Sequence, residues 1–180
     1  QAIPMTELTD FELALLTPDD AKRLHVLFKE NKEDFKTYFP QTLKQLKTIK
    51  ASKAFIEQAQ KHVEAKKEFH FALTTTVHPE IAGLVILKEI DHEKSEAELA
   101  YCLDKRFHGR GWITNAVTRI ADFGYLNHQI TTYRIITHKS NEKSIKVAER
   151  SGFVWHSTLE TEFKPTRGKA QDMELYILKK

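Results

Sequence analysis

A six-residue segment with two glycines, between a strand-like run and a helix-like run, constrains the fold of this chain more than any other feature. The segment, residues 106–111, reads Arg-Phe-His-Gly-Arg-Gly. The apolar residues 99–103 before it are typical of a strand, and the small and apolar residues after it have the i, i+3, i+4, i+7 spacing of an amphipathic helix. Glycine permits a tight turn, and the first N–H groups of a helix favour negative charge. The sequence therefore predicts an anion site here, of a kind that fits a pyrophosphate.

This glycine segment matches neither of two common phosphate-binding motifs. A P-loop continues with Gly-Lys-Ser/Thr, whereas Gly111 is followed by Trp112. A dinucleotide-binding fold requires a third glycine three residues after the second, and that position holds Thr114. Both motifs are therefore excluded at this segment.

A second informative segment follows a run of β-branched residues, 131–138, that is typical of a strand. Residues 141–153 read Asn-x-x-Ser, then seven residues, then Gly-Phe. Asn141 is expected to cap a helix that Gly152 ends.

Together these segments resemble the acyl-coenzyme A signature of the GNAT acetyltransferase superfamily. The pattern Gln/Arg-x-x-Gly-x-Gly/Ala is matched at 106–111, and the second hallmark is similar to 141–153. Residues 98–103, Glu-Leu-Ala-Tyr-Cys-Leu, are similar to the Glu-Ile/Leu-Gly-Tyr-Trp-Leu strand of the branch that contains the ribosomal-protein N-terminal acetyltransferases. The resemblance extends from about Phe11 to the C-terminus, and residues 98–153 carry its specificity.

The resemblance implies acetyl-coenzyme A (acetyl-CoA) as cosubstrate and direct attack of a primary amine in a ternary complex. It places the cofactor against the glycine segment, the backbone of the strand before it and the helix that begins near Asn141. The expected cofactor contacts are Leu99, Tyr101, Cys102, Leu103, Arg106, Phe107, His108, Gly109, Arg110, Gly111, Trp112, Asn141, Lys143 and Lys146.

Three of these residues have alternative roles. His108 either touches phosphate or faces solvent, and Trp112 covers either the cofactor or the core. Cys102 lies in the middle of an apolar run, which favours packing over a covalent acyl-enzyme.

Glu98 is the expected general base, because it aligns with the strand glutamate of the similar branch. The alternative is a sheet-surface carboxylate paired with a lysine, and the rival bases are Glu96, Glu160 and Glu162. Ser144 aligns with the serine of the second hallmark and is expected to protonate the leaving thiolate. Its alternative role is a hydroxyl in the first helical turn that bonds to the backbone.

The order of expected elements is β-α-α-β-β-β-α-β-α-β-β, which is a mixed α/β pattern. It predicts a single acetyltransferase domain over residues 1–180, with a mostly antiparallel central sheet of about seven strands and about four helices. Residues 35–41 are expected to be a loop with exposed aromatic side chains, and 165–171 a turn. Met5 is the expected native start, with residues 1–4 as an extraneous remnant.

The composition limits the classes of binding partner and the cellular compartment that we expect for this chain. The net charge of +3, from 28 basic and 25 acidic residues, is too small to indicate nucleic-acid binding. The single cysteine excludes an internal disulfide and favours the cytoplasm. There is no apolar run of membrane-spanning length. The nine histidines lack short metal-site pairings, so no metal ligand is expected. The oligomeric state is left open.

The branch resemblance favours a protein N-terminal α-amine, such as that of a ribosomal protein, as the acceptor. A small amine (an antibiotic, a polyamine or an amino acid) is an open alternative. A different class is a non-catalytic acyl-CoA-binding or partner-binding module on the same fold, since a fold does not by itself establish turnover.

Overall fold

The computed structural model describes residues 10–163 and 170–180. The expected remnant 1–4, the expected start at Met5 and most of the expected turn 165–171 lie outside the described residues. In the described part of the chain, no helix is long and apolar enough to cross a membrane.

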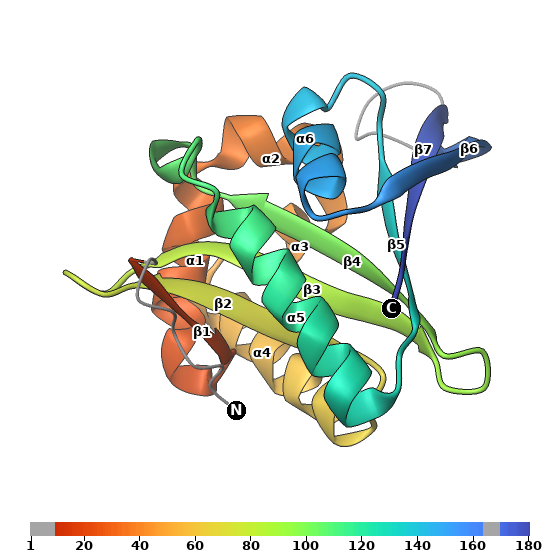
Figure 1. Cartoon of the computed structure of the whole chain (residues 1–180). Coiled ribbons are helices and arrows are strands. Elements are labelled where there is room, and N and C mark those ends of the chain that lie inside the picture. The colour runs from red at the N-terminus through yellow and green to blue at the C-terminus, as the bar shows by residue number, and fades with distance from the viewer. Residues whose placement is uncertain (1–9, 164–169) are drawn as a thin grey trace. The chain divides into compact units, whose positions relative to one another are not determined.

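Seven strands form one mixed sheet in the order β1-β2-β3-β4-β5-β7-β6 (Figure 1). β4 and β5 run parallel, whereas β1/β2, β5/β7 and β6/β7 are antiparallel. The prediction of a mixed, mostly antiparallel sheet is therefore confirmed. The strands are β1 (Phe11–Leu15), β2 (Phe69–Thr75), β3 (Ile81–Asp91), β4 (Glu96–Leu103), β5 (Thr132–Thr137), β6 (Val154–Phe163) and β7 (Gln171–Lys179).

The described residues contain six α-helices, two more than the sequence pattern predicts. Short 3₁₀ turns precede α1 and follow β4 at Pro18–Asp20 and Lys105–Phe107. The helices are α1 (Ala21–Glu30), α2 (Lys32–Tyr38), α3 (Pro40–Gln45), α4 (Ile49–Glu64), α5 (Trp112–His128) and α6 (Glu142–Arg150).

The expected loop at 35–41 is wrong, because this stretch is helical in α2 and α3. Phe35 is only 4% exposed, and its ring meets those of Phe28 and Phe39 edge-on, with centroids 5.0 and 6.0 Å apart. α2 ends at Tyr38, and Pro40 begins α3, where a missing N–H costs nothing.

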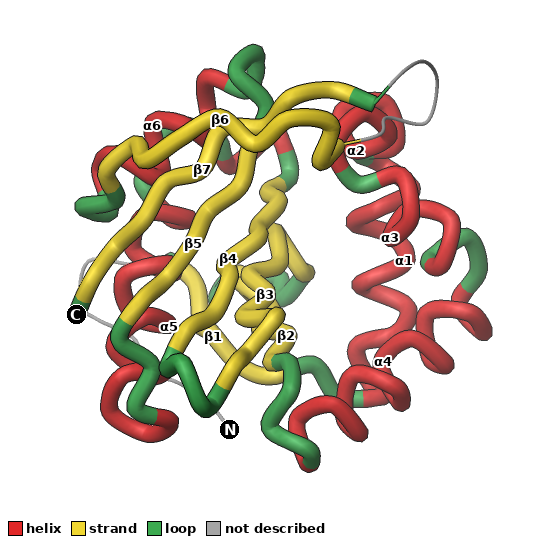
Figure 2. Tube along the Cα trace, turned by 90° about the vertical axis from the view of Figure 1, so that its right-hand side faces the viewer, coloured by secondary structure: helices red, strands yellow, loops and turns green. Residues whose placement is uncertain are grey.

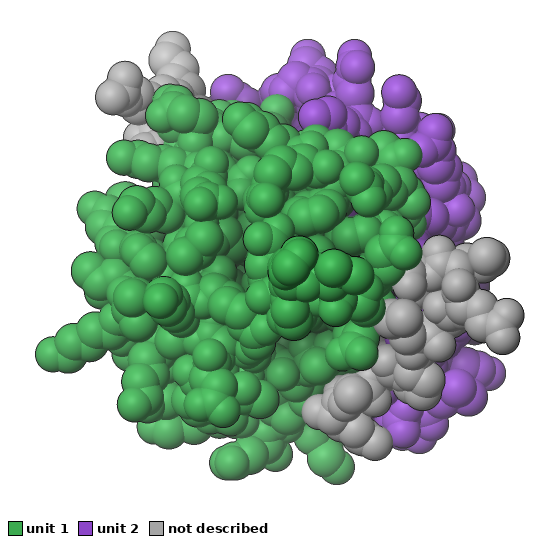
Figure 3. Space-filling model, turned by 90° about the vertical axis from the view of Figure 1, so that its left-hand side faces the viewer, with its two compact units in different colours: residues 1–86, 101–112 green, residues 87–100, 113–180 purple. Residues whose placement is uncertain are grey.

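The chain divides into two compact units, which are coloured separately in Figure 3. Unit 1 comprises residues 1–86 and 101–112, and unit 2 comprises residues 87–100 and 113–180.

In unit 1, α1 packs on α4, α3 lies beside α4, and α4 contacts β2 (Figure 2). The register of β1 on β2 pairs Phe11 with Thr75 and Leu15 with Phe71. The apolar faces of these elements form a core that includes Leu24, Phe28 and Ile56. Burial of such side chains is the main stabilising contribution, at roughly 1.5–3 kcal/mol each.

In unit 2, α5 approaches β5 closely at Gly124. Tyr133 of β5 is fully buried, and its hydroxyl donates a 2.7 Å hydrogen bond to the Ala121 carbonyl of α5. A Cβ on Gly124 would lie 2.3 Å from that hydroxyl oxygen, so only glycine fits at this crossing.

We predict that Gly124→Ala lowers the free energy of unfolding by about 1–3 kcal/mol, because overpacking displaces the bonded Tyr133 ring. At an uncrowded helix position the same change would raise stability by about 1 kcal/mol. A loss of stability would therefore indicate that close packing determines the effect of Gly124→Ala, and a gain would indicate that helix propensity determines it. Equilibrium urea denaturation measures the effect. The double variant Gly124→Ala/Tyr133→Phe, which removes the crowded hydroxyl, should lose less than the sum of the two single changes. A Gly124→Ala protein more stable than the original would contradict the close contact between α5 and β5 at Gly124.

Candidate functional site

The glycine segment lies in unit 1 and has the backbone conformation that its two glycines suggest. The φ angles of Gly109 and Gly111 are +81° and +74°, in the left-handed region that side chains disfavour. A Cβ at either position would meet nothing within 4 Å. Backbone conformation, not lack of space, therefore requires glycine at these two positions.

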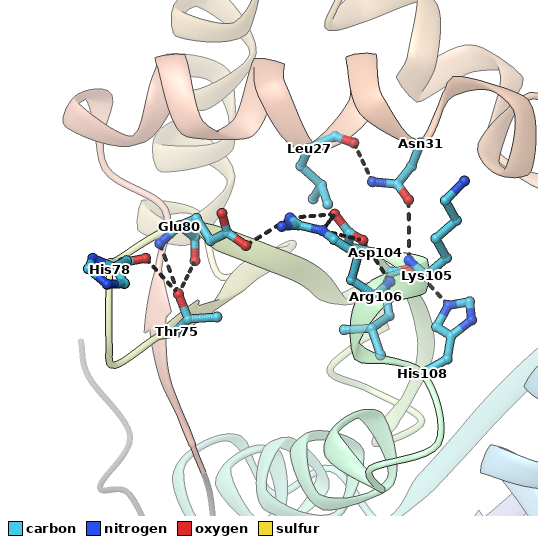
Figure 4. Close-up of polar contacts among 10 residues, drawn as sticks. Leu27, Asn31, Thr75, His78, Glu80, Asp104, Lys105, Arg106 and His108 are labelled. Carbon is cyan, nitrogen blue, oxygen red and sulfur yellow. Dashed lines mark hydrogen bonds and ion pairs between the residues drawn. The ribbon is translucent and has the colours of Figure 1, made fainter.

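The buried carboxylate of Asp104 organises the turn before the glycines. Asp104 is 2% exposed, and one of its oxygens accepts a 2.9 Å hydrogen bond from the Arg106 backbone N–H. The Arg106 guanidinium adds bonds to the same carboxylate at 3.0–3.3 Å, and its Nη2 also donates to Glu80 at 2.8 Å (Figure 4). The Arg106 side chain, an expected cofactor contact, is therefore engaged within the protein.

Two further contacts tie the same turn to α1 and β4. Asn31, 3% exposed, donates through Nδ2 to the Leu27 carbonyl at 2.9 Å and accepts from the Lys105 N–H at 3.3 Å (Figure 4). The Nε2 of His108 lies 3.0 Å from the Leu103 carbonyl oxygen, with a tautomer that makes this nitrogen the donor. Hydrogen bonds within unit 1 therefore hold the backbone at the start of the glycine segment in place.

The pKa of Asp104 reflects these contacts. Burial would raise the pKa of Asp104, but hydrogen bonds from the Arg106 side chain and backbone, with a smaller contribution from Asn31, lower it below the ordinary aspartate value. The carboxylate is therefore charged at neutral pH, and the charge is compensated where it is buried.

Aromatic rings form the other side of the segment. Phe107 and Trp112 stack with centroids 5.0 Å apart, and Trp112 also meets Phe11 at 5.1 Å. The guanidinium of Arg110 lies 5.7 and 5.6 Å from the Phe107 and Trp112 ring centroids, within cation–π range. Trp112 is 5% exposed and packs in the core of unit 1, and its expected contact with the cofactor stays a prediction.

Cys102, also in unit 1, is 7% exposed. Burial raises the pKa of its thiol to about 12, against a smaller opposing effect of a hydrogen bond with the Leu84 backbone. A protonated, buried thiol is a poor nucleophile. The packing interpretation of Cys102 is therefore favoured. Tyr101 and Leu103, the neighbouring expected contacts, are half-buried.

In unit 2, the ladder between β4 and β5 ends early. It pairs Glu96 with Thr132 and Glu98 with Arg134, whereas β5 remains paired with β7 as far as Thr137. Within unit 2, residues 99 and 100 of β4 therefore lie beyond the end of their ladder with β5. The side chain of Leu99 is buried, so an expected contact at Leu99 has to use its backbone.

The candidate base Glu98 is an ion-paired residue. Its carboxylate lies 3.2 Å from the Lys88 ammonium, and its side chain is 15% exposed. Glu96, two residues earlier, pairs with Arg134 at 3.1 Å. The pairing with a lysine is the alternative that the sequence left open, and the catalytic role of Glu98 stays a prediction. Glu160 is exposed on β6, and the side chain of Glu162 lies outside the described residues.

The expected cap of α6 is confirmed. The Asn141 side chain accepts a 3.3 Å hydrogen bond from the Ser144 N–H, and Ser144 is half-buried in the first turn. Lys143 and Lys146 are exposed on the same helix, which packs against β5. Unit 2 therefore carries Glu98, Leu99 and the α6 residues, whereas unit 1 carries Tyr101–Leu103 and the glycine segment.

Sequence reasoning missed four residues that contact expected site residues, three in unit 1 and one in unit 2. Asp104 had a local signal, because an aspartate just before a turn is a common N-terminal cap. Asn31 and Glu80 bond to residues 74 and 26 positions away, and Lys88 reaches Glu98 across a strand pair. No local sequence pattern identifies Asn31, Glu80 or Lys88 as partners of these residues.

The chain is similar to known proteins in sequence and in fold. Residues 10–154 match a family model described as an acetyltransferase (GNAT) domain. The chain is 31% identical to the spermidine N(1)-acetyltransferase of Escherichia coli (strain K12) over 113 residues, which cover 61% of this chain and 60% of that protein.

Two solved structures are similar over nearly the whole chain. The ribosomal-protein-S5-alanine acetyltransferase of Vibrio fischeri has a TM-score of 0.91 at 19% identity, covering 99% of this chain and 96% of that one. The microcin C7 self immunity acetyltransferase MccE, in complex with acetyl-CoA and AMP, has a TM-score of 0.86 at 26% identity, covering 97% and 95%.

We predict that Asp104→Asn destabilises the protein at neutral pH by about 1.5–3 kcal/mol, the range for hydrogen bonds to charged groups. Because folding lowers the pKa of Asp104, its contribution is present above the ordinary aspartate pKa and lost as pH falls through the folded value. The difference between the original protein and Asp104→Asn should therefore shrink on acidification. Urea denaturation at a series of pH values measures it.

Glu33→Gln is the matched control. Glu33 also has a lowered pKa, caused by its hydrogen bond with Lys36, but its side chain is 78% exposed, so its removal should leave stability nearly unchanged. A difference for Asp104→Asn that stays constant with pH would show that its carboxylate is not the stabilising group.

Proposed function

Because this chain belongs to the GNAT acetyltransferase family, we propose that it acetylates the α-amine of a protein N-terminus, such as that of a ribosomal protein. The acetyl group of acetyl-CoA passes to the amine by direct attack in a ternary complex. Residues 1–180 act as a single acetyltransferase domain, and the reaction takes place in the cytoplasm.

The early end of the β4–β5 ladder is the observation that carries this proposal. Beyond Glu98 and Arg134 the two strands no longer pair within unit 2, so the backbone of residues 99 and 100 can pair with a ligand on the side of β4 that faces β5. The pantetheine arm of acetyl-CoA is rich in amides and can pair with such a strand as an added strand does. The glycine segment, with its left-handed glycines, supports pyrophosphate binding through backbone N–H groups.

Amine acetylation requires proton transfers at two points. The attacking amine has to lose a proton, and Glu98 is the base we assign, either directly or through water. Its carboxylate lies 3.2 Å from the Lys88 ammonium, which holds it in place on β4. The leaving thiolate has to gain a proton, and we assign that role to Ser144. A backbone N–H of residues 101–103 stabilises the tetrahedral oxyanion.

A polyamine is the second candidate acceptor, because the chain is 31% identical to a spermidine acetyltransferase. The test is acetyl-CoA-dependent thiol release with a panel of amines. The panel contains peptides with a free N-terminal alanine or serine, the same peptides blocked at the N-terminus but with a lysine, and spermidine. Turnover of free N-terminal peptides alone supports the proposal. Preference for spermidine replaces it with the polyamine function, and no turnover of any amine contradicts both.

We predict that Gly111→Val weakens CoA binding about tenfold or more while the protein remains folded. A β-branched side chain is disfavoured at φ +74°, so the backbone N–H groups would turn away from the phosphates. Gly111→Asn is the matched control, because asparagine tolerates the left-handed region, and it should retain more affinity. Calorimetric titration with CoA measures both. Unchanged affinity in a folded Gly111→Val protein would remove the segment from the cofactor site.

We predict that Glu98→Gln lowers kcat by roughly 10²–10⁴-fold, the usual range for loss of a general base, with little change in CoA affinity. Activity should partly return at high pH, where the amine is already deprotonated. Ser144→Ala should lower the rate without that alkaline recovery, because it acts on the leaving thiolate. The measurement is a pH–rate profile with one identified amine.

Glu96→Gln is the control for the loss of a carboxylate from the same strand, since Glu96 is ion-paired in a similar way. It should keep a rate near that of the original protein. A near-normal profile for Glu98→Gln would exclude Glu98 and leave Glu96, Glu160 and Glu162 as candidates.

A further inference from the structure

Three metal-ligating side chains meet in unit 1 where α4 ends and β2 begins. His62 lies in the last turn of α4, Glu68 immediately before β2, and His70 at its second residue. One Glu68 oxygen lies 2.8 Å from the Nε2 of His70, and the other lies 3.9 Å from the Nδ1 of His62. Among the described residues, one ligand atom from each of the three lies within 4.8 Å of the others.

The backbone between these residues holds them together. The His62 carbonyl accepts hydrogen bonds from the N–H groups of Lys67 and Glu68, at 2.9 and 3.4 Å. Lys66 adopts a φ of +56°, the left-handed conformation that commonly ends a helix. The short distance between His62 and Glu68 is therefore built into the helix end and does not depend on side-chain rotamers alone.

The burial of the three groups suits an ion bound at the surface. His70 is 6% exposed, and its ring meets that of Phe55 edge-on at 5.3 Å, which fixes its orientation. The side chains of His62 and Glu68 are 33% and 30% exposed, so solvent reaches the cluster from one side. Two ring nitrogens and a carboxylate therefore converge on a point that is open to an entering ion.

We propose that His62, Glu68 and His70 bind a divalent first-row transition-metal ion, with Zn²⁺ as the best match. Three atoms no more than 4.8 Å apart have a common point at most about 2.8 Å (4.8/√3) from each. A Zn–N bond is about 2.0–2.1 Å, so shifts of less than about 1 Å complete the coordination. Two histidines and one glutamate leave a fourth position for water, and nitrogen ligands disfavour Mg²⁺ and Ca²⁺.

Two neighbouring features bear on the same ion. The amide nitrogen of Gln58, Nε2, lies 3.2 Å from the Nε2 of His62, the ring nitrogen that is not paired with Glu68. Metal binding through Nδ1 therefore requires the Gln58 amide to turn over, so that its oxygen accepts the Nε2–H of His62, as outer partners of metal-bound histidines do. The C-terminal end of α4 also carries partial negative charge that attracts a cation.

The ion joins α4 to β2 and takes no part in acetyl transfer. His70 lies at one end of β2, whereas Thr75 at the other end contacts Glu80, which holds Arg106. His70 and Thr75 are five residue steps apart along the strand, or roughly 17 Å. The sequence predicts no metal ligand because these histidines are eight residues apart, on a helix and on a strand.

The test uses the full chain without an affinity tag, first stripped with a chelator. Co²⁺ is titrated by visible absorption and Zn²⁺ by calorimetry, and one ion per chain is expected. His62→Asn and Glu68→Gln should each lower affinity at least about tenfold, whereas His156→Asn, at an exposed histidine of unit 2, should not. A hundredfold excess of Zn²⁺ over its Kd should raise the Tm by roughly 5 °C or more, and this shift should be absent in His62→Asn.

Any one of three results would contradict the proposed metal site. These are no bound Co²⁺ or Zn²⁺, equal affinity in the original protein and in both ligand variants, or equal binding of Mg²⁺ and Ca²⁺. Each readout is metal binding or stability, so it is independent of whether the chain acetylates any amine.

Discussion

A buried charge, the carboxylate of Asp104, is the constraint on which the candidate cofactor site depends. An aspartate that is 2% exposed is tolerated only when its charge is compensated, and here a backbone N–H and a guanidinium compensate it. Because the same guanidinium also reaches Glu80, one ion-pair network joins the end of β4, the start of the glycine segment and the start of β3. The conformation of the segment is therefore determined before any ligand arrives.

This network changes the interpretation of the two arginines around the glycines. Arg106 belongs to the family motif, yet its side chain is half-exposed and held by two carboxylates. Arg110 lies against two aromatic rings. We therefore propose that backbone N–H groups form the main anion-binding surface of the segment, with Arg110 as a cation beside it, whereas the side chain of Arg106 is engaged within the protein. A motif residue can be required for binding without touching the ligand.

Local patterns in the sequence predicted local structure well. The strand that includes residues 99–103 and the cap at Asn141 follow from the apolar run and from capping chemistry, which act over a few residues. The stretch 35–41 was predicted wrongly as a loop with exposed aromatic side chains, because the burial of Phe35 depends on its contact with Phe28 of α1. The partners of Arg106, Lys105 and Glu98 lie on other elements, so only the fold reveals them.

The chain contains one cysteine, and its thiol is buried, with a pKa raised to about 12 by burial. A thiol-reactive dye in an activity assay will therefore report the sulfhydryl released as product against a low protein background. Slow labelling of Cys102 itself requires part of β4 to open, since reagents reach a thiolate only when it is exposed. The rate at which Cys102 is labelled therefore measures how often β4 opens beside the glycine segment, and how far a bound ligand slows that opening.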